Sequence, residues 1–347
     1  MGIPTPSIEA EAERLLRALM HVDCDPMGRT WNYEACLGIA PLTLEINRLK
    51  GERDAVILTH SYVEPEIIYG VGDFKGDSYY LSLEAKRSRA SVIVFAGVVF
   101  MAETAKILSP EATVIVPDRQ SGCSLADSIT GEGVRRLKAL YPDATVVCYI
   151  NSTAEVKAES DVCVTSANVY SIVAALEARR IIFVPDRLMA ENLRAELRRL
   201  GVEKEVISSD GTCIVHDTFS RKQIEDARSQ FPGLRVVSHP ECPAEIAEAS
   251  DFVGSTGAMM RYVKQTAAPY FLMLTECGLV GRLQVEAPEK AFIGGCRLCP
   301  YMKMNTLEKV RDALRSPRPD QIVTLDESLR LRAGRCIERM FALAPTN

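Results

Sequence analysis

The sequence repeats itself at intervals of 88 to 90 residues. The stretch YPDATVVCYINSTAEVKAESDVCVTSANV begins at Tyr141, and FPGLRVVSHPECPAEIAEASDFVGSTGAM begins 90 residues later at Phe231. An earlier copy, RDAVILTHSYVEPEIIYGVGDFKGDSYYL, begins at Arg53 and has the same succession of apolar and polar segments. Self-similarity at a fixed interval indicates a repeated structural unit, so we expect three copies of one unit in the chain.

Further residues keep the same offset. Phe95, Phe183 and Phe271 lie 88 residues apart, and the Met-Ala-Glu triplet at Met101 recurs at Met189. Each copy alternates apolar runs of four to six residues with helical patterns. That alternation is typical of βαβ units, in which helices cover a parallel sheet. The sequence therefore predicts an α/β protein made of three repeated three-layer α/β/α units.

Three similar units in one chain are expected to pack about a pseudo-threefold axis. Ligands of open parallel sheets bind at the carboxyl ends of the strands, so the equivalent loops predict one central active site. The repeat places the α/β units at 41–128, 129–217 and 218–299. A helical N-terminal extension is expected at 1–40, and C-terminal helices at 300–347 are expected to pack back on the first unit.

The composition excludes several classes of protein. The 41 basic and 46 acidic residues give a net charge of −5, which offers no electrostatic reason to bind nucleic acid or an anionic membrane. The N-terminus lacks the basic start and apolar core of a secretory signal, and no apolar run is long enough to cross a bilayer. We expect a cytoplasmic protein, in which the eleven cysteines do not form a disulfide framework.

Each copy ends with a cysteine in a polar loop. Cys123 lies in PDRQSGCSLAD, Cys213 lies in SSDGTCIVHD, and Cys296 and Cys299 both lie in GGCRLCPYMKMN. The step from Cys123 to Cys213 is 90 residues and the step from Cys213 to Cys299 is 86, so the spacing follows the repeat. A threefold arrangement would bring one thiol from each unit together. The alternative is a set of unrelated buried thiols, since cysteine is often buried as a small apolar residue.

Three converging thiolates favour a soft metal. Zinc fits the set less well, because structural zinc takes four protein ligands. A cubane 4Fe–4S cluster normally takes four cysteines, so three would leave one iron open. By analogy with open catalytic metal sites, that iron could act as a Lewis acid on a hydroxyl or carboxylate oxygen. His216, three residues after Cys213, is expected beside the cluster and not as its ligand.

Polar side chains stand at matching strand ends. His60, Asn151 and His239 fall at equivalent places in the three copies, and Tyr149 ends the strand before Asn151. A single histidine at a strand end would be interpreted as a structural, hydrogen-bonded residue. Three coincident polar strand ends instead indicate a ligand site.

Hydroxyl side chains precede expected helices in two of the copies. These are Thr165 and Ser166 in TSAN, and Ser255 and Thr256 in GSTG. Serine at this position is a common N-cap. A helix N-terminus also binds phosphate and carboxylate, so the two interpretations are compatible. We predict that these four hydroxyls hold anionic groups of a substrate.

His239 and Glu241 in SHPECP are the predicted proton-transfer pair. Histidine is the natural acid and base near neutral pH. Side chains two residues apart in an extended segment share one side, so the glutamate can orient the histidine or share its proton. The alternative is a structural turn, because Pro240 and Pro243 flank the pair.

Ten short motifs occur in one order between Thr59 and Glu308. They are THSYVEPEI, GDS, FMAETAKIL, VIVPDRQSGC, YINSTAE, TSAN, GTC, SHPECP, GSTG and CPYMKMNTLE. Together they resemble the quinolinate synthase family. The resemblance implies three Rossmann-like units around a 4Fe–4S cluster held by Cys123, Cys213 and Cys299. It also implies condensation of iminoaspartate with dihydroxyacetone phosphate to quinolinate, with loss of phosphate and water, on the de novo route to NAD.

The resemblance assigns further roles. His60 and Ser78 are expected to bind the carboxylates of iminoaspartate, and Tyr62 is expected to form a wall of the site. An aspartate oxidase or dehydrogenase would supply the iminoaspartate. Cys296 becomes an extra thiol, and a Cys296–Cys299 disulfide is a hypothesis for a redox switch. The sequence departs mildly from the family at His60, where it reads HSY in place of HNY or HYY.

Other functions are compatible with parts of the pattern. Diphosphate reductases of isoprenoid synthesis and diphthamide-type radical enzymes also use three cysteines from three units, but they need electron delivery to the cluster. An iron–sulfur sensor paralogue would bind the metal without turnover. A zinc hydrolase would lack the visible absorbance of iron and sulfide.

Overall fold

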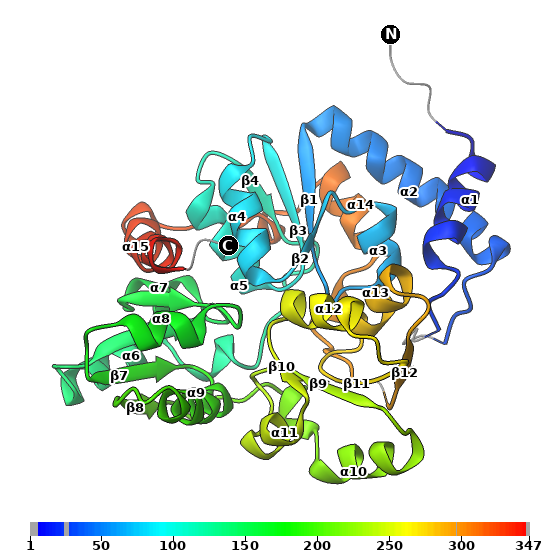
Figure 1. The fold of residues 1–347 in the computed structure, drawn as a ribbon. Helices are drawn as coiled ribbons and strands as arrows, with labels where there is room; N and C mark the ends of the chain where they lie inside the picture. Colours follow the sequence, from blue (N-terminus) through cyan, green and yellow to red (C-terminus); the bar gives the residue numbers. More distant parts are fainter. Residues whose placement is uncertain (1–5, 24–27, 296, 345–347) are drawn as a thin grey trace. The chain divides into compact units, whose positions relative to one another are not determined.

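The computed structural model describes residues 6–23, 28–295 and 297–344. The chain divides into two compact bodies, which Figure 1 shows coloured along the sequence. The first body comprises Met1–Ser121 and Glu276–Val323, and the second body comprises Gly122–Thr275 and Thr324–Asn347. Cys24 and Cys296 lie outside the described residues.

The strands form three four-stranded sheets with one shared topology. The strand orders are β2-β1-β3-β4, β6-β5-β7-β8 and β10-β9-β11-β12, so each sheet has the same order when its strands are counted along the chain. The strands are β1 (Ala55–His60), β2 (Phe74–Gly76), β3 (Val92–Ala96), β4 (Thr113–Ile115), β5 (Thr145–Tyr149), β6 (Val162–Val164), β7 (Arg180–Val184), β8 (Glu205–Ser208), β9 (Arg235–Ser238), β10 (Phe252–Val253), β11 (Tyr270–Leu274) and β12 (Ala291–Ile293).

This topology confirms the predicted α/β class and the three repeated units. The strand pairings β1–β2, β1–β3, β5–β6, β5–β7, β9–β10 and β9–β11 are all parallel. Phe95, Phe183 and Phe271 lie on the equivalent strands β3, β7 and β11, and all three are buried. The central strands are apolar without alternation because helices cover both faces of a parallel sheet.

In each sheet, an aspartate next to an outer strand forms the same pair of hydrogen bonds with a central strand. Asp73, Asp161 and Asp251 each accept a hydrogen bond of 2.8 Å from a backbone N–H near the start of that strand. The N–H of each aspartate returns a bond of 2.8 to 3.0 Å to the carbonyl of the same residue. Those strand residues are Ile57, Val146 and Val236. The reciprocal pair fixes the register of the outer strand on the central one, and the sequence analysis did not anticipate it.

Two helices at the start of the chain pack on each other in the first body. Leu15, Leu19, Trp31 and Ala40 belong to their shared buried core, and α14 packs on α2 and β3. The helix α2 runs past residue 40, so this packing is continuous with the first α/β unit. The helices are α1 (Ile8–Leu19), α2 (Tyr33–Arg53), α3 (Pro65–Gly70), α4 (Ser78–Arg87), α5 (Val99–Leu108), α13 (Gly278–Glu286) and α14 (Leu307–Arg315), with short 3-10 turns η3 (Met302–Met304) and η4 (Pro319–Gln321).

The last helix differs from the expectation for 300–347. α15 contacts α7 and β6 of the second body, whereas α14 belongs to the first. Cys336 and Ile337 on α15 are fully buried, as are Cys148 and Cys163, which are register partners on β5 and β6. These cysteines therefore serve as small core residues.

The remaining helices belong to the second body. They are α6 (Gly131–Leu140), α7 (Ala154–Ala158), α8 (Val169–Ala175), α9 (Arg187–Arg199), α10 (Arg221–Gln230), α11 (Ala244–Ala249), α12 (Thr256–Gln265) and α15 (Glu327–Leu343), with 3-10 turns η1 (Ala126–Ser128) and η2 (His216–Thr218). Side-chain caps begin several of them, for example Asp186 at α9 and Ser255 at α12.

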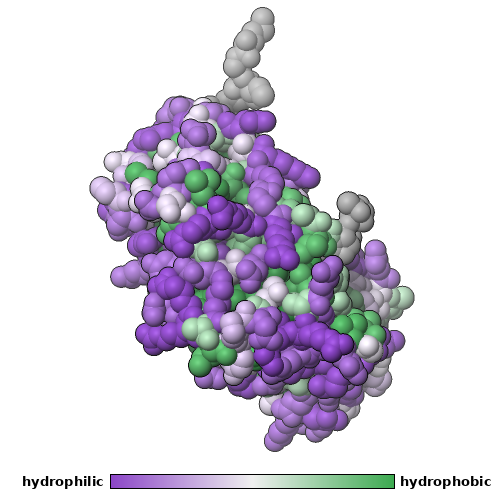
Figure 2. All heavy atoms as spheres, turned by 90° about the vertical axis from the view of Figure 1, so that its left-hand side faces the viewer, coloured by the Kyte–Doolittle hydropathy of each residue, from purple (hydrophilic) through white to green (hydrophobic). Residues whose placement is uncertain are grey.

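The face drawn in Figure 2 is mostly hydrophilic, with apolar patches between hydrophilic side chains. Within the described ranges, none of the helices combines the length and the apolar character needed to span a bilayer.

The aspartate pair predicts a measurable loss of stability. Asp161→Ala leaves the Val146 N–H without its acceptor, so we expect the free energy of unfolding to fall by about 1–3 kcal/mol. Asp161→Asn keeps an acceptor oxygen and should lose less. Asp226→Ala, which removes an exposed carboxylate on α10, is the matched control and should change stability by less than about 0.5 kcal/mol. Urea unfolding of the three variants measures this, and equal losses for Asp161→Ala and the control would contradict the role of the pair.

Candidate active site

A buried carboxylate lies at the carboxyl end of the central strands of the second body. Glu241 is only 3 % exposed, and both of its oxygens are hydrogen-bonded. Tyr149, the last residue of β5, donates its hydroxyl to Oε1 at 2.5 Å, and Nδ1 of His216 lies 2.9 Å from Oε2. Burial by itself would raise the pKa of Glu241, but the two neighbouring histidines and these hydrogen bonds outweigh it and hold the pKa below its ordinary value. Glu241 is therefore an oriented anion.

His239 lies directly beside this anion. Its ring stacks on the ring of His216 with centroids 4.7 Å apart, and its Nδ1 lies 3.6 Å from Oε1 of Glu241. Burial lowers the pKa of His239 to about 3, although the charge of Glu241 opposes the change. His239 is therefore neutral at neutral pH and can exchange a proton with a substrate. The structure brings the predicted pair His239 and Glu241 together, on the loop between β9 and α11.

His216 connects the carboxylate to a cysteine. Its Nδ1 lies 3.2 Å from the sulfur of Cys213 as well as near Glu241, and its Nε2 lies 3.1 Å from the hydroxyl of Thr275. Cys213, His216 and Glu241 offer ligand atoms that all lie within 4.8 Å of one another. Both ring nitrogens of His216 have protein partners, so the sulfur of Cys213 is the group left to bind a soft metal. The expected place of His216 beside a metal, and not as its ligand, stays a prediction.

The Cys123 loop adjoins the Cys213 loop in the same body. The hydroxyl of Ser124 donates to the carbonyl of Thr212 at 3.1 Å and accepts from the N–H of Ile214 at 3.3 Å. Burial, with the charges of Glu241 and Cys123, raises the pKa of the Cys213 thiol well above its usual value. A positively charged metal is the natural partner for sulfurs in such a setting.

The predicted hydroxyls of the third copy lie at the start of α12. Ser255 is the N-cap, and its Oγ accepts from the N–H of Ala258 at 3.3 Å. The hydroxyl of Thr256 is buried and has no hydrogen-bond partner among the described residues, and the same holds for Ser238 at the end of β9. Buried hydroxyls normally have partners, so these two suit a ligand.

The hydroxyls of the second copy differ in one respect. The N-cap residue of α8 is Asn168, and neither Thr165 nor Ser166 takes that place. Oδ1 of Asn168 accepts from the N–H and the hydroxyl of Thr165 at 2.7 and 3.3 Å, which folds the TSAN segment into a tight turn. Ser166 and Asn151 are both partly exposed.

The predicted residues of the first body also lie at strand ends. His60 is the last residue of β1 and is buried, and its Nδ1 accepts from the N–H of Tyr62 at 3.3 Å. The rings of His60 and Tyr62 meet edge to face, with centroids 4.7 Å apart. Ser78 is the first residue of α4 and follows the N-cap Asp77.

Cys299 lies in the first body and is a free thiol. Its backbone N–H donates to Oε1 of Glu276 at 3.2 Å. Burial raises the pKa of the Cys299 thiol to about 11. Cys296, the other half of the hypothetical redox pair, lies outside the described residues.

Sequence reasoning missed Asn192, which holds the His239–Glu241 loop, and Asp186, whose charge interacts with that of Glu241. Nδ2 of Asn192 on α9 donates to the carbonyls of Pro240 and Cys242, both at 2.8 Å, on either side of Glu241. Asp186 caps α9 and is completely buried, and burial followed by the charge of Glu241 raises its pKa. Asp186 carried a sequence signal for a cap, whereas Asn192 lies within an ordinary helical pattern.

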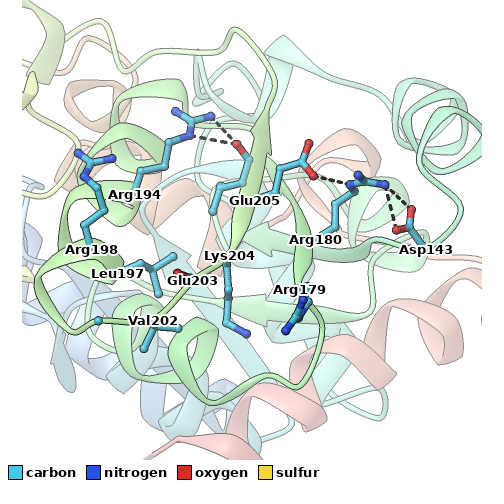
Figure 3. Close-up of a pocket in the computed structure, with 12 residues that line it drawn as sticks. Asp143, Arg179, Arg180, Arg194, Leu197, Arg198, Val202, Glu203, Lys204 and Glu205 are labelled. Carbon is cyan, nitrogen blue, oxygen red and sulfur yellow. Dashed lines mark hydrogen bonds and ion pairs between the residues drawn. The ribbon is translucent and has the colours of Figure 1, made fainter.

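A groove of about 1000 Å³ in the second body does not belong to this site (Figure 3). It lies at the amino ends of β7 and β8, where Arg180 and Glu205 begin the strands, whereas the predicted residues follow the carboxyl ends. Much of its charge is already paired, because Arg180 binds Asp143 and Glu205, and Lys204 binds two backbone carbonyls. The charged side chains that line the groove therefore have structural roles, and we do not assign the groove to the active site.

Parallel α/β units whose strand-end loops carry cysteines, histidines and a buried glutamate are typical of the class of α/β enzymes. The family model described as quinolinate synthetase A protein matches residues 44–342. The chain belongs to this family.

Curated relatives cover most of the chain. The quinolinate synthase of Caulobacter vibrioides is 44% identical, and the match covers 99% of this chain and 91% of that protein. Quinolinate synthase 2 of Mesorhizobium japonicum is 46% identical over 85% of this chain and 89% of that protein. The quinolinate synthase of Xylella fastidiosa is 45% identical over 86% of each.

The contacts of Asn192 predict an effect on turnover. Asn192→Asp keeps the shape but removes the N–H donors, so the Pro240 and Cys242 carbonyls lose their partner and Glu241 loses its position. We expect turnover to fall about tenfold to hundredfold, since small misplacements at a reacting centre have effects of this size. Glu191→Gln, an isosteric change on the more exposed side of α9, is the control. Steady-state kinetics, measured on variants that fold as well as the wild type, check the result. Unchanged turnover in Asn192→Asp would show that Asn192 does not position Glu241 for the reaction.

Proposed function

We propose that this chain condenses iminoaspartate with dihydroxyacetone phosphate to give quinolinate, phosphate and water, in the de novo synthesis of NAD. Family membership supports the activity. The observation that carries the proposal is the buried arrangement of Tyr149, Glu241, His216 and Cys213 beside a neutral His239. It combines an oriented anion, a group able to exchange protons and a sulfur ligand in one place.

The proposed cofactor is a 4Fe–4S cluster held by Cys123, Cys213 and Cys299. The donor set fits, because thiolates in loops suit iron and sulfide and because both nitrogens of His216 are occupied. The orphaned polar atoms near the strand ends fit a reactant beside such a group. When bound, the cluster would offer an open iron as a Lewis acid toward a hydroxyl or carboxylate oxygen.

Anionic groups of the substrates are assigned to the strand-end hydroxyls and His60. Ser255 and Thr256 lie at the positive end of α12, a helix of 10 residues, and the unpartnered hydroxyl of Thr256 can donate to a phosphate or carboxylate oxygen. Thr165, Ser166 and Asn151 would play the corresponding part in the second unit. His60 and Ser78 would bind the carboxylates of iminoaspartate.

Proton transfer is assigned to His239. A neutral histidine can accept a proton from a substrate, and the charge of Glu241 favours the protonated form by opposing the effect of burial on the pKa of His239. Glu241 holds the hydroxyl of Tyr149 and the ring of His216 in fixed directions, and it stabilises positive charge on His239. Tyr62 is proposed to form a wall of the site and to limit the entry of water.

The upstream supplier is proposed to be an aspartate oxidase or dehydrogenase, because iminoaspartate hydrolyses readily. We place the reaction in the cytoplasm, where reducing conditions keep cysteine ligands as thiols. The competing functions are a reductase or radical enzyme built on the same three-cysteine plan and a sensor without turnover. Quinolinate formation by the purified enzyme without an added reductant separates the proposal from both.

The ligand assignment predicts which cysteines are needed for iron. Cys123→Ala, Cys213→Ala and Cys299→Ala should each lose most of the bound iron and sulfide and all but a trace of activity. Cys242→Ala, a buried thiol in the His239 loop that contacts the carbonyl of Leu274, should keep a full cluster, as should Cys296→Ala. Anaerobic iron and sulfide analysis with visible spectra decides this. Full iron content in any of the first three variants would remove that residue from the ligand set.

The unpartnered hydroxyl predicts an effect on substrate binding. Thr256→Val removes the buried hydroxyl without removing a protein hydrogen bond, so stability should hold while KM for one of the two substrates rises about tenfold. Thr266→Val, at the opposite end of α12, removes a hydroxyl that bonds the carbonyl of Tyr262 and should leave KM unchanged. Titration of each substrate separately measures the effect. KM values for both substrates that match the wild type in Thr256→Val would argue against an anion at this helix end.

A further inference from the structure

A lysine with little solvent exposure joins three loops of the first body. Lys303 lies in the 3-10 turn η3, four residues after Cys299, and 13 % of its side chain is exposed. Its ammonium group donates to the carbonyl of Tyr62 at 2.8 Å and lies 3.2 Å from Oε1 of Glu276 and 3.5 Å from Oε1 of Glu64. An ammonium group has three N–H donors, so these three acceptors account for all of them.

Glu276 links this lysine to the cysteine loop. Its side chain is 1 % exposed, and Oε1 accepts the N–H of Cys299 as well as facing Lys303. Oε2 accepts the N–H of Gly278 at 2.6 Å. A carboxylate buried this deeply is unfavourable unless a cation and hydrogen-bond donors face it. Lys303 is the cation that faces Glu276 among the described contacts of this carboxylate.

Lys303 also contacts the loop that carries Tyr62 and Glu64. Glu64, at the N-cap of α3, faces Lys303 with one carboxylate oxygen, and Arg29 lies 3.8 Å from the other. Gly278 allows the close approach, because a Cβ there would lie 2.7 Å from the Tyr62 carbonyl and 2.8 Å from Oε2 of Glu276. The segments that carry Tyr62, Glu276 and Cys299 are therefore packed against each other with Lys303 at the centre.

We propose that Lys303 is a positioning residue that fixes the Cys299 loop and the Tyr62 loop in one arrangement. The proposal rests on the proposed function, in which Cys299 binds the cluster and Tyr62 borders the substrate. One ammonium group then sets the place of a metal ligand and of an aromatic wall together. Nothing in the sequence spacing alone distinguishes Lys303 from the other lysines of the C-terminal region.

The charge of Lys303 has a second consequence. A cation held near Cys299 stabilises the more negative, reduced state of a bound cluster. Its removal should shift the midpoint potential of the cluster to a more negative value. A residue that served only to stabilise the fold would not produce that shift.

The test compares Lys303→Met, Lys303→Gln and a control in full-length protein. Lys303→Met removes the charge and all donors, whereas Lys303→Gln keeps two N–H donors and should fold even where the methionine variant does not. Lys309→Met is the matched control, because Lys309 forms an ion pair of 2.6 Å with Asp118 and donates to the carbonyl of Met304. Lys309 is more exposed and contacts neither the Tyr62 carbonyl nor Glu276 in any described hydrogen bond or ion pair.

The first measurement is amide hydrogen exchange before the cluster is loaded. We expect exchange in 61–66 and 297–304 to be at least tenfold faster in Lys303→Met, with a smaller increase in Lys303→Gln and none in the control. Exchange that matches the wild type, or that rises equally throughout the first body, overturns the proposal. This measurement does not depend on cluster or activity, so a wild-type protein without iron would refute the proposed function and leave this test intact.

The second measurement uses the loaded enzyme. We expect kcat of Lys303→Met to fall at least tenfold per bound cluster, and the midpoint potential to move negative in Lys303→Met and Lys303→Gln but not in Lys309→Met. Unchanged kcat and potential in a fully loaded Lys303→Met protein overturn the proposal.

Discussion

The parallel pairing of short central strands determines where the chemistry of this chain can occur. Parallel strands end at the same edge of a sheet, so the residue after each strand lies beside its equivalent from the neighbouring strand. In each of the three sheets, the first central strand ends at or just before a polar residue: β1 ends at His60, β5 ends at Tyr149, and β9 ends one residue before His239. The aspartates Asp73 and Asp161 hold the outer strands in register, and a slip of one residue would turn these polar ends to the other face.

Burial of charge is the second constraint, and it separates the roles of neighbouring side chains. Glu241 and His239 are both almost inaccessible to solvent, and the pKa of each lies below its ordinary value for a different reason: burial lowers the pKa of His239, whereas at Glu241 the neighbouring histidines and two hydrogen bonds outweigh burial. The glutamate stays ionised and the histidine stays neutral. This difference favours His239 as the group that transfers a proton and Glu241 as the group that orients Tyr149 and His216.

The sequence predicted the parts of the structure that depend on local pattern and repetition. The three sheets, the equivalence of Phe95, Phe183 and Phe271, and the meeting of His239 with Glu241 all follow from periodicity and spacing. The placement of α15 on α7 and β6 could not be predicted in this way, because an amphipathic helix at a chain end carries no signal for which surface it covers.

The residues that were missed have a common physical character. Asn192 and Lys303 act through bonds to backbone carbonyls, and a carbonyl is present at every position, so no sequence pattern marks the recipient. The turn at Asn168 is a related case. Ser166 had the right residue type for an N-cap, but Asn168 fills that place, and its side chain bonds Thr165.

In each body, a basic side chain faces the buried carboxylate that lies near a proposed cysteine ligand. In the second body, His216 lies between Glu241 and the sulfur of Cys213, and in the first body Lys303 faces Glu276, which accepts the N–H of Cys299. A buried carboxylate beside a thiolate ligand would repel it, and a donor between or behind them reduces that repulsion. Since both arrangements are complete within their own body, the loops of the proposed ligands can be pre-organised before any metal binds. The conformation of each loop is then set by contacts within its own body, and binding of the proposed cluster does not have to order either loop.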